Sequence, residues 1–271
     1  MQVIAGGKRH REASMSLMPS KQAVDEECPE GELPLIRIEP QLTENSTYVL
    51  VAKRNSGKSV LALHILVLLF RRKLVDYAVS FSGSQQFNND WKCLFPKNRI
   101  EGFDDDKLRQ LIEFQQNEKR QQMKSKGKYK GKRLLIILDD IIGQEQGTEK
   151  SKNLDYVLSA GRHILITIIV IVQYGQKVIS PTVRNNIDFM AISRNNPSVM
   201  DQLYGILNGF CGSKKEFRKF VFQNTTGFSF LWWNNTREAR DLGTWHRVSV
   251  SADEKRFQDE FQLQKNKKSL Y

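Results

Sequence analysis

The sequence is poor in cysteine and histidine. Its three cysteines, Cys28, Cys93 and Cys211, are odd in number and lie far apart in a chain of 271 residues. This pattern predicts no disulfide framework and favours a reducing, intracellular setting. None of the four histidines stands at a metal-ligand spacing from a cysteine or from another histidine, so no structural zinc site is expected.

Long apolar runs are also missing. The two longest, residues 61–70 and 164–172, fall far short of the roughly 20 residues that a transmembrane helix needs. The N-terminus begins Met-Gln-Val-Ile-Ala and lacks the apolar stretch of a signal peptide. The sequence therefore predicts no membrane span.

Acidic residues are too few to balance the basic ones. The chain has 42 Lys and Arg against 30 Asp and Glu, which gives a formal net charge of +12. A basic chain favours a polyanionic partner, but nucleic acid, anionic lipid and acidic proteins all satisfy the same Coulombic attraction. Hydrophobic residues make up 39% of the sequence, enough for a folded chain of this length to bury a substantial core.

The order of apolar segments predicts an α/β fold. Strands are expected at residues 35–38, 47–52, 75–81, 134–138, 164–172 and 187–192, and helices at residues 60–73, 104–123, 152–160 and 197–208. The strand segments are continuously apolar rather than alternating, which is typical of a parallel sheet covered by helices on both faces. Residues 217–222 and 227–233 are expected to form a closing hairpin, and a charged helix is expected from residue 251.

Composition divides the chain into three parts. Residues 1–33 have no persistent apolar period and are expected to form a flexible tail, residues 34–208 the α/β core, and residues 209–271 an extension with a hairpin and a charged end. Two polar segments are expected to be mobile loops. One is residues 143–153; the other, residues 119–133, carries eight basic side chains and no acid and is called the lysine-rich segment below. It is either a contact to DNA phosphates or a solvated insertion.

A phosphate-binding loop is predicted between a strand and a helix. Residues 52–59 read Ala-Lys-Arg-Asn-Ser-Gly-Lys-Ser, the Walker A pattern with alanine in place of its first glycine. Such a loop turns backbone N–H groups toward a β-phosphate, while its lysine reaches the β- and γ-phosphates and its last hydroxyl binds Mg²⁺. The alternative is an ordinary turn with a surface lysine. The candidate nucleotide-binding residues are Ala52, Lys53, Arg54, Asn55, Ser56, Gly57, Lys58 and Ser59, and Ala52 fits only if its φ is negative.

Three polar side chains follow two of the predicted strands. Asp139 and Asp140 come directly after residues 134–138, and Gln173 comes directly after residues 164–172. Ligands of open α/β sheets bind at the carboxyl ends of the strands. We therefore expect Asp139 to hold Mg²⁺ through water, Asp140 to orient or deprotonate the attacking water, and Gln173 to sense the γ-phosphate or hold that water. The alternatives are a helix N-cap for the aspartates and a loop-starting residue for Gln173.

Five ordered motifs resemble the poxvirus A32-like genome-packaging ATPases of large and medium DNA viruses, relatives of the FtsK/HerA motors. These motifs are Lys53-Arg54-Asn55-Ser56-Gly57-Lys58-Ser59; Phe81-Ser82-Gly83-Ser84 with Phe95-Pro96 and Gln115-Gln116; Leu138-Asp139-Asp140; Gly161-Arg162-His163 with Gln173; and the octapeptide at residues 181–188. The resemblance covers about residues 35–195.

The resemblance implies a P-loop NTPase with a mainly parallel sheet of the additional-strand (ASCE) type. The strand at residues 164–172 would then lie between the phosphate-loop strand and the strand that ends at Asp139. ATP and Mg²⁺ are the implied cofactors. The resemblance also implies a homo-oligomeric ring in which an arginine of one subunit completes the site of its neighbour. Arg162 is the favoured candidate and Arg184 the other, although Arg184 has the alternative role of pairing with Asp188.

The implied activity is ATP-driven translocation of double-stranded DNA into a viral capsid, through contacts with the phosphate backbone. Capsid proteins would be partners, and the site of virion assembly in the host cell, or the virion itself, would be the location. Two alternatives remain open: a motor of the same class in another role, such as DNA transfer or helicase-like remodelling, and a basic nucleic-acid binding protein that does not hydrolyse ATP.

Overall fold

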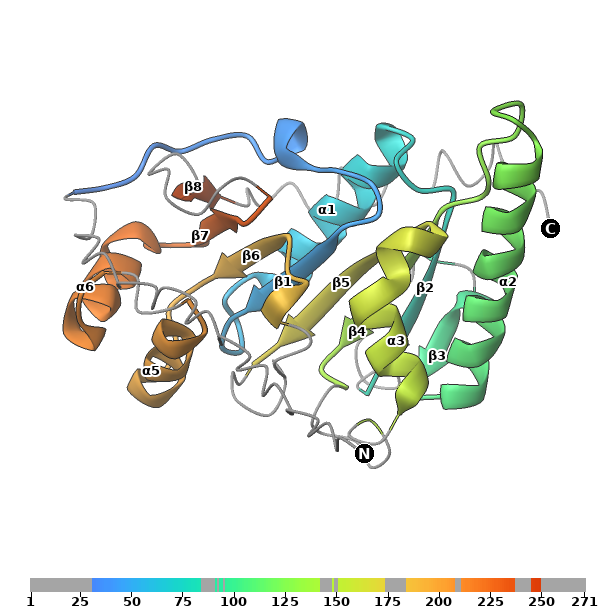
Figure 1. Cartoon of the computed structure of the whole chain (residues 1–271). Helices are drawn as coiled ribbons and strands as arrows, with labels where there is room; N and C mark the ends of the chain where they lie inside the picture. Colours follow the sequence, from blue (N-terminus) through green and yellow to red (C-terminus); the bar gives the residue numbers. More distant parts are fainter. Residues whose placement is uncertain are drawn as a thin grey trace, which may run out of the picture.

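An eight-stranded sheet with helices on both faces forms the centre of the protein (Figure 1). The computed structural model describes residues 31–83, 91, 93–94, 96–141, 148, 151–173, 184–207, 211–236 and 245–249. The strand order is β3-β2-β4-β5-β1-β6-β7-β8. Strands β1 to β6 run parallel, and β7 and β8 add an antiparallel ribbon at one side. The predicted α/β fold with a mainly parallel sheet is therefore confirmed.

The strands are β1 (Thr47–Val51), β2 (Tyr77–Ser82), β3 (Arg99–Glu101), β4 (Leu134–Asp139), β5 (Ile166–Val172), β6 (Phe189–Ile192), β7 (Ser229–Asn234) and β8 (Trp245–Ser249). The α-helices are α1 (Lys58–Arg71), α2 (Asp105–Lys124), α3 (Lys152–Ala160), α5 (Pro197–Ile206) and α6 (Lys214–Asn224), and the short 3-10 helices are η1 (Glu39–Gln41), η2 (Pro96–Asn98) and η4 (Gly161–Ile164).

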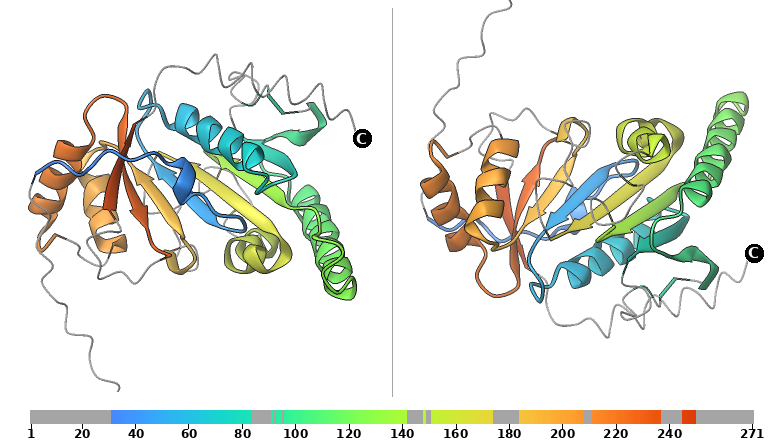
Figure 2. Two further views of the ribbon diagram at one scale, coloured as in Figure 1. Left: turned by 90° about the horizontal axis from the view of Figure 1, so that it is seen from above. Right: turned by 90° about the horizontal axis from the view of Figure 1, so that it is seen from below.

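Two apolar layers cover the two faces of the sheet. Successive side chains of a strand point to opposite faces. In β1, Tyr48 and Leu50 pack with α1, whereas Val49 and Val51 pack into the other layer, with α2, α3, α5 and α6. Figure 2 shows α1 and α3 on opposite sides of the sheet. Burial on both faces explains why the parallel strands are continuously apolar in sequence.

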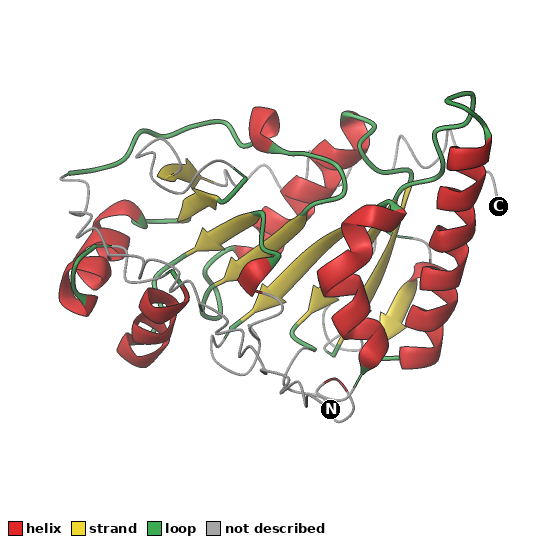
Figure 3. Ribbon diagram, in the orientation of Figure 1, coloured by secondary structure: helices red, strands yellow, loops and turns green. Residues whose placement is uncertain are grey.

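The position of β5 confirms the order that the resemblance implies. β5 lies between β1 and β4, and the register pairs Val51 with Val172 and Asp139 with Ile171. The three strands consequently end at one edge of the sheet, here called the carboxyl edge; the opposite edge, where they begin, is the amino edge (Figure 3). The residues that follow β1, β4 and β5 must therefore lie close together.

The predicted hairpin is wrong in its first strand. Residues 217–222 belong to helix α6, which begins after Ser213, whose hydroxyl accepts a hydrogen bond from the Glu216 N–H at 3.2 Å. The true partner of β7 is β8, with Ser229 opposite Ser249. Because β7 also pairs with β6, this extension continues the sheet of the core.

The first five residues of the lysine-rich segment were predicted both as the end of a helix (residues 104–123) and as part of a mobile loop, and the structure confirms the helix. Helix α2 continues to Lys124, and the chain then turns at Lys126 and Gly127, which have φ values of 49° and 86°. Glu118, buried inside α2, accepts hydrogen bonds from the Lys132 N–H at 2.7 Å and from the Tyr129 hydroxyl. These bonds hold the end of the segment against the helix.

Smaller differences occur near the ends of the described chain. Residues 35–38 form only an isolated bridge, between Leu35 and Arg247, and the sequence did not predict β3. Two residues of the predicted tail are held in place, because Glu32 pairs with Arg247 and the Leu33 N–H donates to Asn224. Residues 1–30 and 251–271, with the expected charged helix, lie outside the described residues, as do residues 143–147, 149 and 150 of the second predicted loop.

Cys211 takes part in a disulfide bond, contrary to the expectation, whereas Cys93 is buried and takes part in none, and Cys28 lies outside the described residues. Within the described ranges, no helix has the length and apolar character that crossing a membrane requires.

Candidate nucleotide-binding site

The loop between β1 and α1 has the backbone shape of a phosphate loop. Asn55 and Gly57 have φ values of 58° and 86°, and the Ser56 hydroxyl closes the turn by donating to the Lys53 carbonyl at 2.7 Å. A Cβ atom on residue 57 would stand 3.2 Å from Cδ1 of Phe228, so both the conformation and the space favour glycine. Ala52 is fully buried and is not among the residues with positive φ, which explains why alanine fits there.

The N-terminus of α1 is suited to an anion. Helix α1 begins at Lys58, directly after Gly57, and it has no acidic residue in its first turn and no side-chain cap. The first N–H groups of a helix lack partners within the helix and carry a partial positive charge. Phosphate oxygens are natural acceptors for these N–H groups. Ser59 lies in this first turn, the position from which the last hydroxyl of a phosphate loop binds Mg²⁺ in other P-loop proteins.

Lys58, Asp140 and Gln173 meet at the carboxyl edge. Lys58 Nζ lies 3.6 Å from Asp140 Oδ2, and Gln173 Nε2 donates a hydrogen bond to the same oxygen. The other carboxylate oxygen, Asp140 Oδ1, is buried and has no hydrogen-bond partner among the residues that the structure describes. A buried acceptor without a donor is costly, and a water molecule would satisfy it. The structure thus brings together three side chains that the sequence placed at the ends of β4 and β5 and at the start of α1.

Asp139 faces a different set of partners from Asp140. It is only 5% exposed, and its Oδ2 accepts hydrogen bonds from the Trp91 indole N–H at 3.0 Å and from the Ser82 hydroxyl at 3.2 Å. Ser82 ends β2, the neighbour of β4, so the sheet itself places the hydroxyl. Trp91 was not predicted, because nothing in the local sequence links it to Asp139.

Replacing Trp91 by phenylalanine tests this contact. The ring stays, but the indole N–H that orients the Asp139 carboxylate is lost, and loss of such supporting bonds costs about tenfold or more in metal affinity or activity. We expect a correspondingly higher Mg²⁺ requirement in a titration of ATPase rate. Trp233→Phe, in β7, is the matched control. An unchanged Mg²⁺ dependence in Trp91→Phe would show that the bond does not support the site.

Asn195 is a second residue that was not predicted. It follows β6, and its buried amide donates to the Gln173 carbonyl at 3.1 Å while its Oδ1 accepts from the Asn196 N–H at 2.9 Å. This amide ties the end of β6 to Gln173 across the carboxyl edge. The sequence signal is weaker than for Asp139 and Gln173, because Ser193 and Arg194 separate Asn195 from the apolar strand β6.

Arg162 and Arg184 lie at the opposite edge of the sheet. Arg162 is exposed in η4, just before β5, and Arg184 is exposed ahead of β6. The seven residues of β5 separate the two edges by roughly 20 Å. The carboxylate of Asp188, beside Arg162, accepts from the Thr47 N–H at 2.8 Å. Burial raises the pKa of Asp188 above its usual value and outweighs the opposing effects of that N–H and of the Arg162 charge. Neither arginine can reach the phosphate loop of its own chain.

The residues at the carboxyl edge fit a magnesium ion that is bound together with a nucleotide. No group of three or more His, Cys, Asp and Glu side chains that could hold a metal by itself occurs in the described part of the chain. Mg²⁺ needs no such group beside a nucleotide, since phosphate oxygens and water supply most of its ligands. The Ser59 hydroxyl and the buried Asp139 carboxylate would supply the remaining ligands, Asp139 through water.

The fold and the loop together define the class of the protein. A mainly parallel sheet with β5 inserted between β1 and β4, and a Gly-Lys-Ser loop at the start of α1, are the features of a P-loop NTPase of the ASCE type. Residues 40–222 match the family model described as Poxvirus A32 protein, and the chain belongs to that family. The family resemblance stated from the motifs is confirmed.

Individual proteins also resemble this chain, at low sequence identity. Uncharacterized protein L437 of Acanthamoeba polyphaga mimivirus is 24% identical over 195 residues, which cover 70% of this chain and 67% of that protein. The genome packaging NTPase B204 from Sulfolobus turreted icosahedral virus 2, in complex with sulfate, is 17% identical with a TM-score of 0.52, covering 78% of this chain and 98% of B204.

Two further solved structures share the fold. The pCW3 conjugation coupling protein TcpA, in a monomer form with ATPγS, is 14% identical with a TM-score of 0.55, covering 85% of this chain and 66% of TcpA. EssC (ATPases 2 and 3) from Geobacillus thermodenitrificans is 13% identical with a TM-score of 0.56, covering 91% of this chain and 51% of that one. At these identities the likeness concerns the fold.

Proposed function

We propose that this chain is an ATP-hydrolysing motor that translocates double-stranded DNA and packages a viral genome into a capsid. One observation carries the proposal: Lys58, Asp140 and Gln173 converge at the N-terminus of α1, beside the buried Asp139. A partly buried carboxylate next to a phosphate loop, with one buried oxygen that no described residue satisfies, favours hydrolysis over simple binding of nucleic acid.

Nucleotide binding begins with the phosphate loop. The N–H groups of α1 and the Lys58 ammonium group bind the β- and γ-phosphates, as in other P-loop proteins. Lys58 now pairs with Asp140, so a γ-phosphate competes with that carboxylate for the ammonium group. Arrival of ATP thereby releases Asp140 to accept a proton. Mg²⁺, held by Ser59 and through water by Asp139, would neutralise charge between the β- and γ-phosphates.

Hydrolysis then uses the two side chains that remain at the carboxyl edge. Water in hydrogen-bond contact with Asp140 gives its proton to the carboxylate, while its oxygen attacks the γ-phosphorus and the bond to the β,γ-bridging oxygen breaks. The products are ADP and phosphate. Gln173, which already donates to Asp140, orients that water and responds to the loss of the γ-phosphate.

The family and the charge of the chain support DNA as the polymer that is moved. B204, which shares the fold, is described as a genome packaging NTPase. A net charge of +12 favours the DNA backbone, which the motor would contact largely without reading sequence. The proposal includes a homo-oligomeric ring, capsid proteins as partners, and a location at the site of virion assembly.

Measurement of ATPase activity with and without duplex DNA tests the proposal. We expect turnover that requires Mg²⁺ and increases when duplex DNA is added. A chain that bound DNA but showed no turnover under either condition would be a binding protein, and the proposed motor would be excluded.

Another role for the same motor is the second candidate, because TcpA is a conjugation coupling protein of the same fold. The two roles differ in their partner. A packaging motor binds capsid proteins of its own virus, whereas a coupling protein does not. Recovery of capsid protein with the chain during virion assembly is expected for packaging, and its absence from assembling particles would favour DNA transfer.

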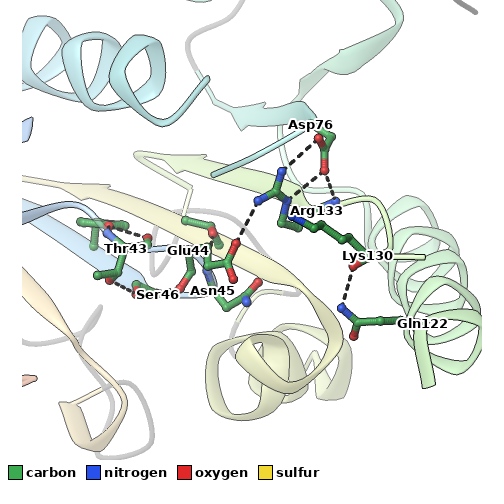
Figure 4. Close-up of polar contacts among 10 residues, drawn as sticks. Thr43, Glu44, Asn45, Ser46, Asp76, Gln122, Lys130 and Arg133 are labelled. Atoms are coloured by element: carbon green, nitrogen blue, oxygen red, sulfur yellow. Dashed lines mark hydrogen bonds and ion pairs between the residues drawn. The ribbon is translucent and has the colours of Figure 1, made fainter. Parts of the chain in front are cut away.

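The lysine-rich segment gives a prediction about the DNA contact. Four of its lysines, Lys124, Lys126, Lys128 and Lys130, are exposed, whereas Arg133 is engaged by Asp76 at 3.0 Å and by Glu44 at 2.9 Å (Figure 4). Each phosphate contact adds about 0.9 to the slope of log affinity against log salt. Replacing the four lysines by glutamine should therefore make the slope shallower and reduce stimulation by DNA, with basal ATPase unchanged.

A matched variant sharpens this test. Lys214, Lys215 and Lys219 are exposed on α6, and their replacement by glutamine should leave the salt slope nearly unchanged. The reverse result, with an unchanged slope in the first variant and a shallower slope in the second, would move the DNA contact to α6 and leave the lysine-rich segment as solvated surface.

A further inference from the structure

Phe228 is an exposed aromatic side chain in contact with the phosphate loop. It lies in the turn between α6 and β7 and is 59% exposed, although it carries a large apolar ring. Its Cδ1 atom would be 3.2 Å from a Cβ on Gly57, so the ring lies directly against the loop. Its exposed ring is therefore placed where a nucleotide bound to the loop can lie against it.

The sheet places Phe228 at the carboxyl edge. β7 runs antiparallel to β6, with Leu231 opposite Ile192, so β7 begins where β6 ends. The strand order sets β4 and β5 on one side of β1, and β6 and β7 on the other. Asp140 and Gln173 consequently lie on one side of the phosphate loop, and Phe228 lies on the other.

A nucleotide on this loop has its two ends on these two sides. The γ-phosphate must point toward Asp140 and Gln173, because those side chains act on it in the proposed function. The α-phosphate, ribose and base then extend away from them, toward β6 and the turn that holds Phe228. A phenyl ring has no hydrogen-bonding group, but it offers a π-face on which a base can stack.

We infer that Phe228 is the base-stacking residue of the nucleotide site. The inference rests on the proposed function, since it takes a nucleoside triphosphate as the ligand. Stacking tolerates every base and is stronger for the larger purines. Phe228 therefore favours purine over pyrimidine nucleotides without distinguishing adenine from guanine through hydrogen bonds.

Binding of ATP, CTP and inorganic tripolyphosphate to the full chain, measured by calorimetry, tests the inference. Phe228→Ala should weaken ATP binding by about five- to a hundredfold, in line with the value of one stacked base. It should weaken CTP binding less, so that the preference for purine shrinks, and leave tripolyphosphate binding unchanged. Phe228→Trp should restore ATP binding. Phe114→Ala, an exposed phenylalanine of α2, is the matched control and should leave all three ligands unaffected.

The outcomes separate this inference from the proposed function. If the unaltered chain bound neither ATP nor tripolyphosphate, the proposed function itself would fail. If the unaltered chain binds ATP and Phe228→Ala binds it equally well, only the stacking role would be overturned. An equal loss of ATP and tripolyphosphate binding would also overturn it, and would show that the ring supports the shape of the loop at Gly57 instead. Circular dichroism of each variant checks that the fold is retained.

Discussion

Asp140→Asn is expected to stop ATP hydrolysis and to leave ATP binding intact. The change removes the negative charge that accepts a proton, while the amide oxygen still accepts the hydrogen bond from Gln173. A general base typically contributes about 10²- to 10⁴-fold to a rate, so turnover should fall by at least about a hundredfold. ATP binding should be equal or tighter, because Lys58 loses the carboxylate that competes with the γ-phosphate.

Neighbouring substitutions should give different results. Lys58→Ala removes the cation that binds the phosphates, and Asp139→Ala removes the carboxylate that supports Mg²⁺, so each should abolish turnover. Lys58→Ala should in addition weaken binding of ATP. Single-turnover hydrolysis and equilibrium nucleotide binding distinguish these cases, and Asp155→Asn, an exposed carboxylate of α3, is the control. Wild-type turnover by Asp140→Asn would show that Asp140 is not the base.

Subunits that carry Arg162→Ala are expected to be inactive alone and to regain activity when mixed with Lys58→Ala subunits. Arg162 lies at the amino edge, roughly 20 Å from the phosphate loop of its own chain, so any action on ATP must reach a neighbouring subunit. An arginine that stabilises charge on the transferred phosphoryl group contributes about 10³- to 10⁵-fold. Some interfaces in a mixed ring would join an intact loop to an intact arginine.

The mixing experiment has two informative controls. Arg109→Ala, on the exposed face of α2, should retain activity and should not change the result of mixing. Arg184→Ala should behave like the wild type if Arg162 is the acting residue. Rescue of Arg184→Ala subunits, with no rescue of Arg162→Ala, would reverse the assignment between the two arginines.

The sequence predicted the features that depend on local pattern. Continuous apolar runs located β1, β2, β4, β5 and β6, and the polar residues after β4 and β5 located Asp140 and Gln173. The error at residues 217–222 came from weighting Phe and Val as strand formers. A better signal was present, because Ser213 and Glu216 have the spacing of a capping box and Phe217, Phe220 and Val221 follow a helical spacing.

The features that were missed depend on contacts between distant segments. Trp91 reaches Asp139 across 48 positions in the chain, and no pattern within the sequence indicates that bond. The contact of Phe228 with Gly57 likewise arises only because β7 pairs with β6. In the lysine-rich segment, the sequence predicted the charges and the helix up to residue 123, but not the hydrogen bonds to Glu118, which come from residues that follow the turn.

The separation of the phosphate loop from Arg162 along β5 has a consequence for assembly. If one subunit supplies an arginine from its amino edge to the carboxyl edge of the next, the interface joins two different surfaces. Such a heterologous, head-to-tail interface closes into a ring or continues as a helical filament, and it cannot form a two-fold symmetric dimer. Every site in a closed ring is then completed by its neighbour, whereas an open oligomer leaves one terminal subunit with an incomplete site.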